Sequence, residues 1–98
     1  MKNLIENRTQ EVEKLIESYN GAIEIIYRSG DEHADELVIE GISYRVEIYI
    51  YENEYHLFTS DFLGTYTEDE RTDGKNHKTV KTLRGVKGYI RKYALDIK

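Results

Sequence analysis

The stretch ISYRVEIYIYENEYHLFTS, residues 42–60, decides the fold because apolar and polar residues alternate along it as they do in a β-hairpin. In its first half, one side of the period-two pattern carries Ile42, Tyr44, Val46, Ile48 and Ile50. The other side carries Ser43, Arg45, Glu47, Tyr49 and Tyr51. We expect residues 42–51 to form one long strand that turns the first side to the core and the second side to the surface.

The turn at residues 52–53 determines which face the second strand of the hairpin presents. A two-residue turn pairs Ile50 with Tyr55, keeps the apolar positions of both strands on one face, and places His56 and Phe58 on the surface side. A three-residue turn would instead place His56 and Phe58 on the core side. We favour the tighter turn because its asparagine tolerates a positive φ angle.

Amphipathic helices are predicted on both sides of the hairpin. Upstream, residues 4–19 carry apolar side chains at helical spacing, namely Leu4, Ile5, Val12, Leu15, Ile16 and Tyr19. Asn20 and Gly21, which readily adopt the left-handed conformation, end this helix. Downstream, Thr82 is a candidate N-cap for a final helix. Its apolar face comprises Leu83, Val86, Ile90, Tyr93, Ala94 and Ile97. Gly85 and Gly88 fall away from that face, so we expect them to leave helix backbone bare and not to serve core packing.

The remaining segments complete the predicted fold. Residues 22–28 and 36–39 are short and rich in β-branched side chains, which favours strands, and Gly41 supplies either a turn or a bulge before the hairpin. Residues 61–77 contain few apolar residues and a dense acidic cluster, which predicts an exposed loop. The sequence therefore predicts one α+β domain over residues 1–98, with α-β-β-β-(β)-α order. Its three- or four-stranded antiparallel sheet would pack against both helices in two layers.

Composition restricts the classes of function. The 98 residues include no cysteine, so no disulfide or thiolate metal site is available. No apolar run approaches the roughly 18 residues of a membrane span, and no secretory signal is evident, so we expect a cytoplasmic protein without membrane contact. The net charge of −5 conceals an asymmetry. Residues 1–74 hold 18 acidic and 6 basic residues, a net charge of −12, whereas residues 75–98 hold one acidic and eight basic residues, a net charge of +7.

No motif indicates catalysis or metal binding. The three histidines lie far apart in the sequence, without a zinc-binding HExxH spacing, and no nucleophile motif is present. Residues 69–80 begin like a calcium-binding loop, but Arg71 occupies its third position and Val80 its twelfth, where oxygen ligands are needed. We therefore predict a protein that is not an enzyme and that uses neither a metal nor a cofactor.

An acidic, tyrosine-rich surface is the leading candidate for a binding site. Its members are carboxylates and tyrosines of the hairpin and of the following segment: Glu47, Tyr49, Tyr51, Glu52, Glu54, Asp61, Tyr66, Glu68, Asp69 and Glu70. Carboxylates can stand in for phosphates against a basic surface, and tyrosines supply rigid contact area. With these features the chain resembles small acidic phage and mobile-element inhibitors, including anti-CRISPR proteins and other nucleic-acid mimics. The resemblance implies an inhibitor of a nucleic-acid-handling protein partner, such as a CRISPR effector nuclease.

A basic flank of the final helix supports an alternative function. It comprises Lys78, Lys81, Arg84, Lys87 and Arg91, which could contact phosphates or could balance the acidic remainder of the molecule. The order of elements, with basic residues at the start of the last helix, resembles a double-stranded RNA-binding domain. In that family a lysine-rich helix start lies across the RNA phosphates, and Lys78, Lys81 and Arg84 are the matching positions. An exposed hairpin edge could also pair with a second copy, so a homodimer is left open.

Overall fold

The structure, a computed structural model, describes residues 2–42, 44–60 and 77–95. Its elements in chain order are α1 (Lys2–Glu17), β1 (Glu24–Gly30), β2 (Asp35–Glu40), β3 (Arg45–Ile50), β4 (Tyr55–Ser60), β5 (His77–Val80), α3 (Leu83–Tyr89) and the π-helical turn η1 (Ile90–Ala94). The strands form one antiparallel sheet in the order β1-β2-β3-β4-β5. The α+β prediction is thus confirmed, with five strands in place of three or four.

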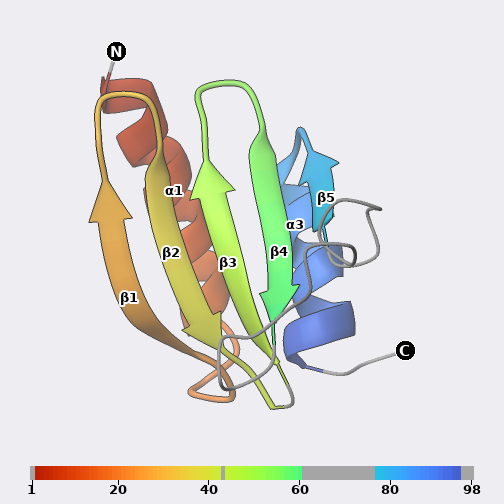
Figure 1. The fold of residues 1–98 in the computed structure, drawn as a ribbon. Coiled ribbons are helices and arrows are strands. Elements are labelled where there is room, and N and C mark those ends of the chain that lie inside the picture. Colours follow the sequence, from red (N-terminus) through yellow and green to blue (C-terminus); the bar gives the residue numbers. More distant parts are fainter. Residues whose placement is uncertain (1, 43, 61–76, 96–98) are drawn as a thin grey trace.

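The described residues form two layers, with the sheet in one and the helices in the other (Figure 1). Both α1 and α3 lie behind the sheet, and no described helix covers its opposite face. We call the helix-covered side the inner face and the opposite side the outer face. Side chains from the inner face and from the helices form the hydrophobic core, which comprises Ile5, Val12, Ile16, Ile23, Leu37, Ile39, Val46, Ile48, Ile50, Tyr55, Leu57, Val86, Tyr89, Ile90 and Ala94.

The β3–β4 hairpin has the predicted register. Ile50 pairs with Tyr55, Ile48 with Leu57 and Val46 with Thr59. The backbone N–H of Tyr51 donates to the carbonyl oxygen of Glu54 at 2.9 Å, which closes a two-residue turn at residues 52–53. Asn53 does not have the positive φ angle for which this turn was favoured. Because side chains alternate between faces, this turn places every apolar residue of the two inner rows beneath the helices.

The prediction of one long strand from residue 42 was wrong. Strand β3 begins at Arg45, and Ile42 and Tyr44 are 60% and 44% exposed instead of lying in the core. The N–H of Gly41 donates to the carbonyl of Tyr44, and the N–H of Ile42 donates to the carbonyl of Ala94 at 2.7 Å. A Cβ atom at Gly41 would lie 2.3 Å from that Ala94 oxygen, so glycine is required for this close contact between the β2–β3 turn and η1.

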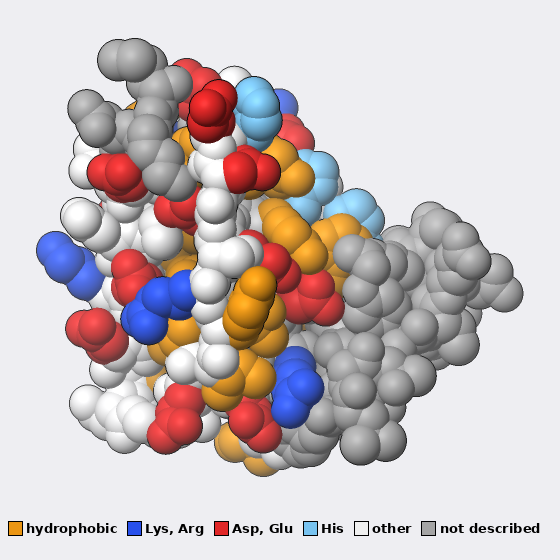
Figure 2. Space-filling model, turned by 60° about the vertical axis from the view of Figure 1, so that its left-hand side comes forward, with side chains coloured by type: hydrophobic (Ala, Val, Ile, Leu, Met, Phe, Trp, Pro, Cys, Tyr) orange, Lys and Arg blue, Asp and Glu red, His pale blue; other side chains and the backbone are white. Residues whose placement is uncertain are grey.

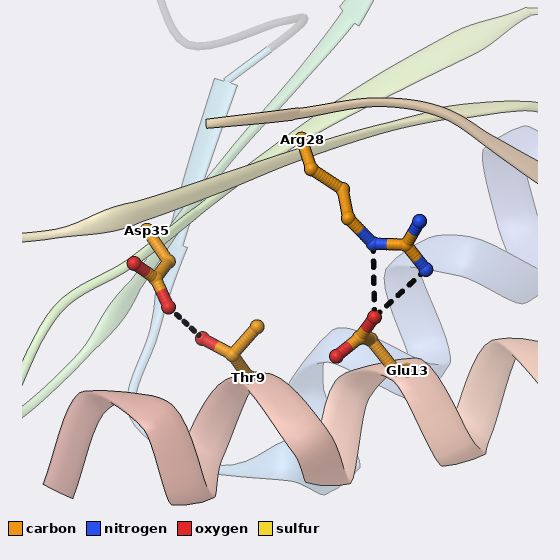
Figure 3. A network of polar contacts seen from close by, with 4 residues as sticks. All are labelled: Thr9, Glu13, Arg28 and Asp35. Carbon is orange, nitrogen blue, oxygen red and sulfur yellow. Dashed lines mark hydrogen bonds and ion pairs between the residues drawn. The ribbon is translucent and has the colours of Figure 1, made fainter. Parts of the chain in front are cut away.

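Helix α1 is joined to the first two strands by polar contacts as well as by apolar packing (Figure 3). The Thr9 hydroxyl donates to an Asp35 carboxylate oxygen of β2 at 2.8 Å. The Arg28 guanidinium of β1 contacts one Glu13 carboxylate oxygen through Nη2 at 2.8 Å and through Nε at 3.0 Å. After the helix, Asn20 and Gly21 have φ angles of 56° and 87°, as predicted for its end. Leu4 is 42% exposed, so its predicted place in the core was wrong.

The final helix begins as the sequence predicts but packs differently. The Thr82 hydroxyl accepts a hydrogen bond from the Gly85 N–H at 3.2 Å, which confirms the N-cap. Gly85, however, faces Val80 of β5, and a Cβ atom there would lie 2.7 Å from the Cβ atom of Val80. The prediction that both glycines avoid packing is therefore wrong for Gly85. At Gly88 an added Cβ would meet nothing within 4 Å, so only this glycine leaves helix backbone bare.

Strand β5 was not expected from the sequence, because residues 61–77 were interpreted as an exposed loop. His77 instead belongs to β5 and is half-buried. Residues 61–76 lie outside the described part of the chain, so that part of the loop prediction is not tested. Strand β5 is only four residues long, and it pairs with β4 from Tyr55 opposite Val80 to Phe58 opposite His77.

The two glycines of α3 predict opposite effects of the same substitution. We expect Gly85→Ala to lower the free energy of unfolding by about 1–3 kcal/mol, because the added methyl group overlaps Val80. Gly88→Ala should raise it by about 0.5–1 kcal/mol, because alanine favours the helix and meets open space. Urea unfolding followed by circular dichroism measures both, and equal effects of the two substitutions would contradict the described packing.

A buried hydrogen bond between Thr59 of β4 and Tyr89 of α3 predicts a dependence of stability on alkaline pH. Burial raises the pKa of the Tyr89 hydroxyl from its ordinary value of 10.0 to about 12, although its bond to Thr59 acts in the opposite direction. The unfolded chain therefore loses this proton near pH 10, while the folded chain retains it. The resulting stabilisation is fully present below pH 10 and is lost as the pH rises towards 12.

The matched variant for this prediction is Tyr89→Phe, which keeps the ring and removes the ionisable group. We expect it to be about 1–3 kcal/mol less stable at neutral pH, because the buried Thr59 hydroxyl loses its partner. Its unfolding free energy should decline less steeply than that of the wild type between pH 10 and 12. Parallel declines of the two proteins would show that Tyr89 does not contribute to the alkaline loss.

Candidate functional site

The outer face of the sheet is built from two rows of side chains that run across all five strands. The first row consists of Tyr27, Val38, Glu47, Phe58 and His77, and the second consists of Ser29, Glu36, Tyr49, His56 and Thr79. Glu40, Arg45, Tyr51 and Glu54 extend the rows at their ends. These positions alternate with the core residues of the same strands, so the pleat that buries the core also displays this surface.

Aromatic rings are in continuous contact across the central and β5 side of the outer face. The Tyr51 and His56 ring centroids are 4.9 Å apart, and those of His56 and His77 are 5.7 Å apart. Phe58 stacks on His77 at 4.3 Å with an interplanar angle of 6°, and Tyr49 meets Phe58 edge to face at 5.6 Å. Figure 2 shows the histidine and hydrophobic side chains side by side, with carboxylates among them. The five rings form a preorganised aromatic row.

Carboxylates border the aromatic row and are hydrogen-bonded to it. The Tyr49 hydroxyl donates to Glu47 at 3.1 Å, and His56 Nε2 lies 2.5 Å from a Glu54 carboxylate oxygen. On β1, the Ser29 hydroxyl donates to Glu36 at 3.1 Å. These bonds hold the acidic side chains beside the rings, so a cationic group that stacks on a ring would also meet a carboxylate.

The electrostatic environment of Tyr49 is negative. Its pKa lies well above the ordinary value, first because the hydroxyl is buried and then because the negative charges of Glu47 and Glu36 disfavour the phenolate. Tyr49 therefore remains a neutral hydrogen-bond donor throughout the physiological range. The outer face carries four carboxylates and one guanidinium. The carboxylates belong to Glu36, Glu40, Glu47 and Glu54, and the guanidinium belongs to Arg45.

The structure brings together only part of the acidic site predicted from the sequence. Glu47, Tyr49, Tyr51 and Glu54 lie on the outer face, and Glu52 is exposed in the turn beside them. The other five predicted members, Asp61, Tyr66, Glu68, Asp69 and Glu70, lie outside the described residues. His77 and Glu36 belong to the aromatic and acidic surface but were missed. The signal for Glu36 was its alternation with Leu37, whereas His77 could be found only by recognising β5.

The predicted basic residues lie on the other side of the molecule. Arg84 and Lys87 are in α3 and Arg91 is in η1, both on the inner-face side of the sheet, and all three are exposed. Lys78 pairs with the inward-facing Leu57, which places it on the helix side of β5, and Lys81 follows in the connection to α3. The basic flank is therefore separated by the sheet from the acidic outer face, and its relation to the acidic residues of 61–76, outside the described residues, is not tested.

Comparisons with known proteins and a search for other sites add no identification. The chain matches no protein-family model, and no curated protein or solved structure matches it significantly. Among the described residues, no group of three or more potential ligand side chains is arranged to hold a metal ion. None of the helices in the described ranges is long and apolar enough to cross a membrane.

Proposed function

We propose that this chain is a non-enzymatic binding protein that blocks a nucleic-acid-handling protein, such as a CRISPR effector nuclease, through its outer face. The observation that carries the proposal is the row of contacting aromatic rings bordered by carboxylates on a sheet face that no described helix covers. Proteins that handle nucleic acids present arginine and lysine to phosphates, and this surface offers those side chains an alternative partner.

The chemistry of the outer face suits arginine in particular. A guanidinium group can stack on an aromatic ring while its N–H groups donate to a neighbouring carboxylate. Tyr49 with Glu47, and His56 with Glu54, each combine a ring and a carboxylate within hydrogen-bonding distance. Phosphates, in contrast, would be repelled by the same carboxylates, so direct nucleic-acid binding to this face is disfavoured.

Charge reversal at the end of the outer face tests this proposal. The tagged chain is used to capture partners from a host lysate, and the affinity of each recovered protein is then measured by titration at low and high salt. We expect Glu52→Lys with Glu54→Lys to weaken the complex at least tenfold at low salt and less at high salt, because screening reduces the lost attraction.

The matched control for that experiment is Glu6→Lys with Glu17→Lys, which makes the same change in net charge on exposed positions of α1. This control should leave the affinity nearly unchanged. Recovery of no nucleic-acid-binding protein, or an equal loss of affinity in both double variants, would count decisively against the outer face as an inhibitory surface.

The basic flank supports a second candidate function, direct binding of nucleic acid. Within the described part of the chain, none of Lys78, Lys81, Arg84, Lys87 and Arg91 forms an ion pair with a carboxylate. Gly88 adds a stretch of bare helix backbone between Lys87 and Arg91. An exposed line of cations that form no ion pair with the described carboxylates is suited to phosphate contacts.

Gel-shift titrations with duplex RNA, duplex DNA and single strands at low salt test this second function. If the basic flank binds phosphates, Lys81→Glu with Lys87→Glu should abolish the shift, and single Lys→Ala changes should each reduce the salt-dependence slope by about one. Lys14→Glu on α1 serves as a control that should have no effect. Absence of a shift with every probe at low salt would remove this function from consideration.

A further inference from the structure

Strand β1 is an exposed edge of the sheet. Six of its seven residues pair with β2, Ile26 lies in a bulge, and every residue of the strand except Ile25 is exposed. Ile26 and Tyr27 are 41% and 54% exposed, unusually high values for large apolar side chains in a strand. In Figure 1 this strand lies at the left margin of the sheet, and no described strand lies beyond it.

The backbone of β1 presents unpaired hydrogen-bonding groups along this edge. The N–H of Asp31 donates to the carbonyl of Ala34 at 2.9 Å, which fixes the phase of the β1–β2 ladder. By the alternation of antiparallel pairs, Ser29 then bonds to β2, whereas Arg28 and Gly30 direct their N–H and C=O groups outward. The bulge between Ile25 and Tyr27 interrupts this phase, so the regular part of the free edge extends from Tyr27 to Gly30.

Hollows flank the free edge on both faces of the sheet. On the outer face, a hollow of about 290 Å³ is lined by Asp31, Glu36, Tyr49 and Tyr51. On the inner face, a hollow of about 260 Å³ is lined by Thr9 and Leu37 among others, and both hollows share Ser29 and Gly30. Further along β1, a hollow of about 350 Å³ on the helix side is lined by Ile16, Ile23 and Ile25 together with Glu17, Glu24 and Arg28.

These features together define a site for strand addition. An extended chain beside β1 would bond to Arg28 and Gly30 and would direct alternate side chains to opposite faces, which is where the hollows lie. The outer hollow combines two tyrosines with carboxylates and suits a cationic side chain. Of the two helix-side hollows, the one beside Thr9 is lined mainly by polar residues, whereas the one with three isoleucines accommodates an apolar side chain. At Gly30, a Cβ atom would lie 2.2 Å from an Asp35 carboxylate oxygen, so a larger residue at this point between the two hollows would have to displace that carboxylate.

We propose that an extended segment of the partner protein, with basic and apolar residues in alternation, adds to the sheet beside β1. This inference rests on the proposed function in so far as the partner is a basic protein, but it assigns a separate edge and a separate mode of binding. A second copy of this chain fits poorly as the added strand. Arg28 is the basic residue of β1 and is already paired with Glu13, so a second β1 would bring no unpaired cation to the carboxylates of the outer hollow.

Synthetic peptides test the inference before the partner itself is identified. The first probe is a fluorescently labelled, end-blocked peptide in which three arginines alternate with valines, so that all the arginines face one side of an added strand. The second has the same composition with arginines and valines in separate blocks. By fluorescence anisotropy we expect the alternating peptide to bind at least tenfold more tightly than the blocked one.

A pair of substitutions at Arg28 distinguishes backbone pairing from charge attraction. Arg28→Pro removes the outward N–H, whereas Arg28→Ala removes the same ion pair with Glu13 and keeps the N–H. We expect the alternating peptide to bind Arg28→Ala and to lose at least tenfold in affinity for Arg28→Pro, with circular dichroism showing that both variants are folded. Should Arg28→Pro also unfold, a peptide N-methylated at alternate residues should lose the same affinity for the wild type.

Two results would overturn strand addition. Equal affinities for the alternating and blocked peptides would show that charge alone is recognised, and equal affinities of the two Arg28 variants would show that the β1 backbone is not used. Either result leaves outer-face binding intact, because that proposal is tested at Glu52 and Glu54, which do not line the hollows beside β1. Conversely, if the double substitution at Glu52 and Glu54 does not change the affinity for the partner, the preference for the alternating peptide still stands as evidence for strand addition.

Discussion

The register of the β3–β4 hairpin is the constraint on which the rest of the molecule depends. The two-residue turn pairs Ile48 with Leu57, and both side chains are completely buried beneath the helices. A slip of one residue would turn this inner row outward and would bring Tyr49 and His56 beneath α1 and α3. The core and the candidate binding surface are therefore two results of a single choice of register. A substitution that shifts the register of β3 or β4 would therefore alter the core and the outer face together.

The sheet also separates the acidic residues of its outer face from the cations of α3 and η1. Acidic residues and aromatic rings share the outer face, whereas the exposed cations of α3 and η1 lie beyond the helix layer. A five-stranded sheet and its buried apolar core stand between them, so neither group can reach the other through direct contact. Each surface consequently keeps its charge available to partners, although like charges then repel one another within each surface.

The sequence was informative where local chemistry determines the structure. Alternation identified the hairpin faces, Asn20 and Gly21 marked the end of α1, and Thr82 marked the start of α3. It was misleading at Ile42 and Tyr44, because their exposure results from the contact between Gly41 and Ala94, which are distant in the chain. Strand β5 was missed for a related reason. Residues 77–80 carry little strand pattern of their own and are held by pairing with β4 and by the close packing of Val80 against Gly85.

The contact between the β2–β3 turn and η1 has a consequence for how the chain folds. The first four strands follow one another as neighbours, so their pairings join segments that are close in sequence, and such contacts form rapidly. The bond from the Ile42 N–H to the Ala94 carbonyl instead closes a loop of about fifty residues, which is entropically unfavourable to form early. The meander of strands can therefore assemble first, and docking of α3 and η1 against Gly41 then converts a one-sided sheet into a closed core. Cooperativity in this small protein resides in that late junction.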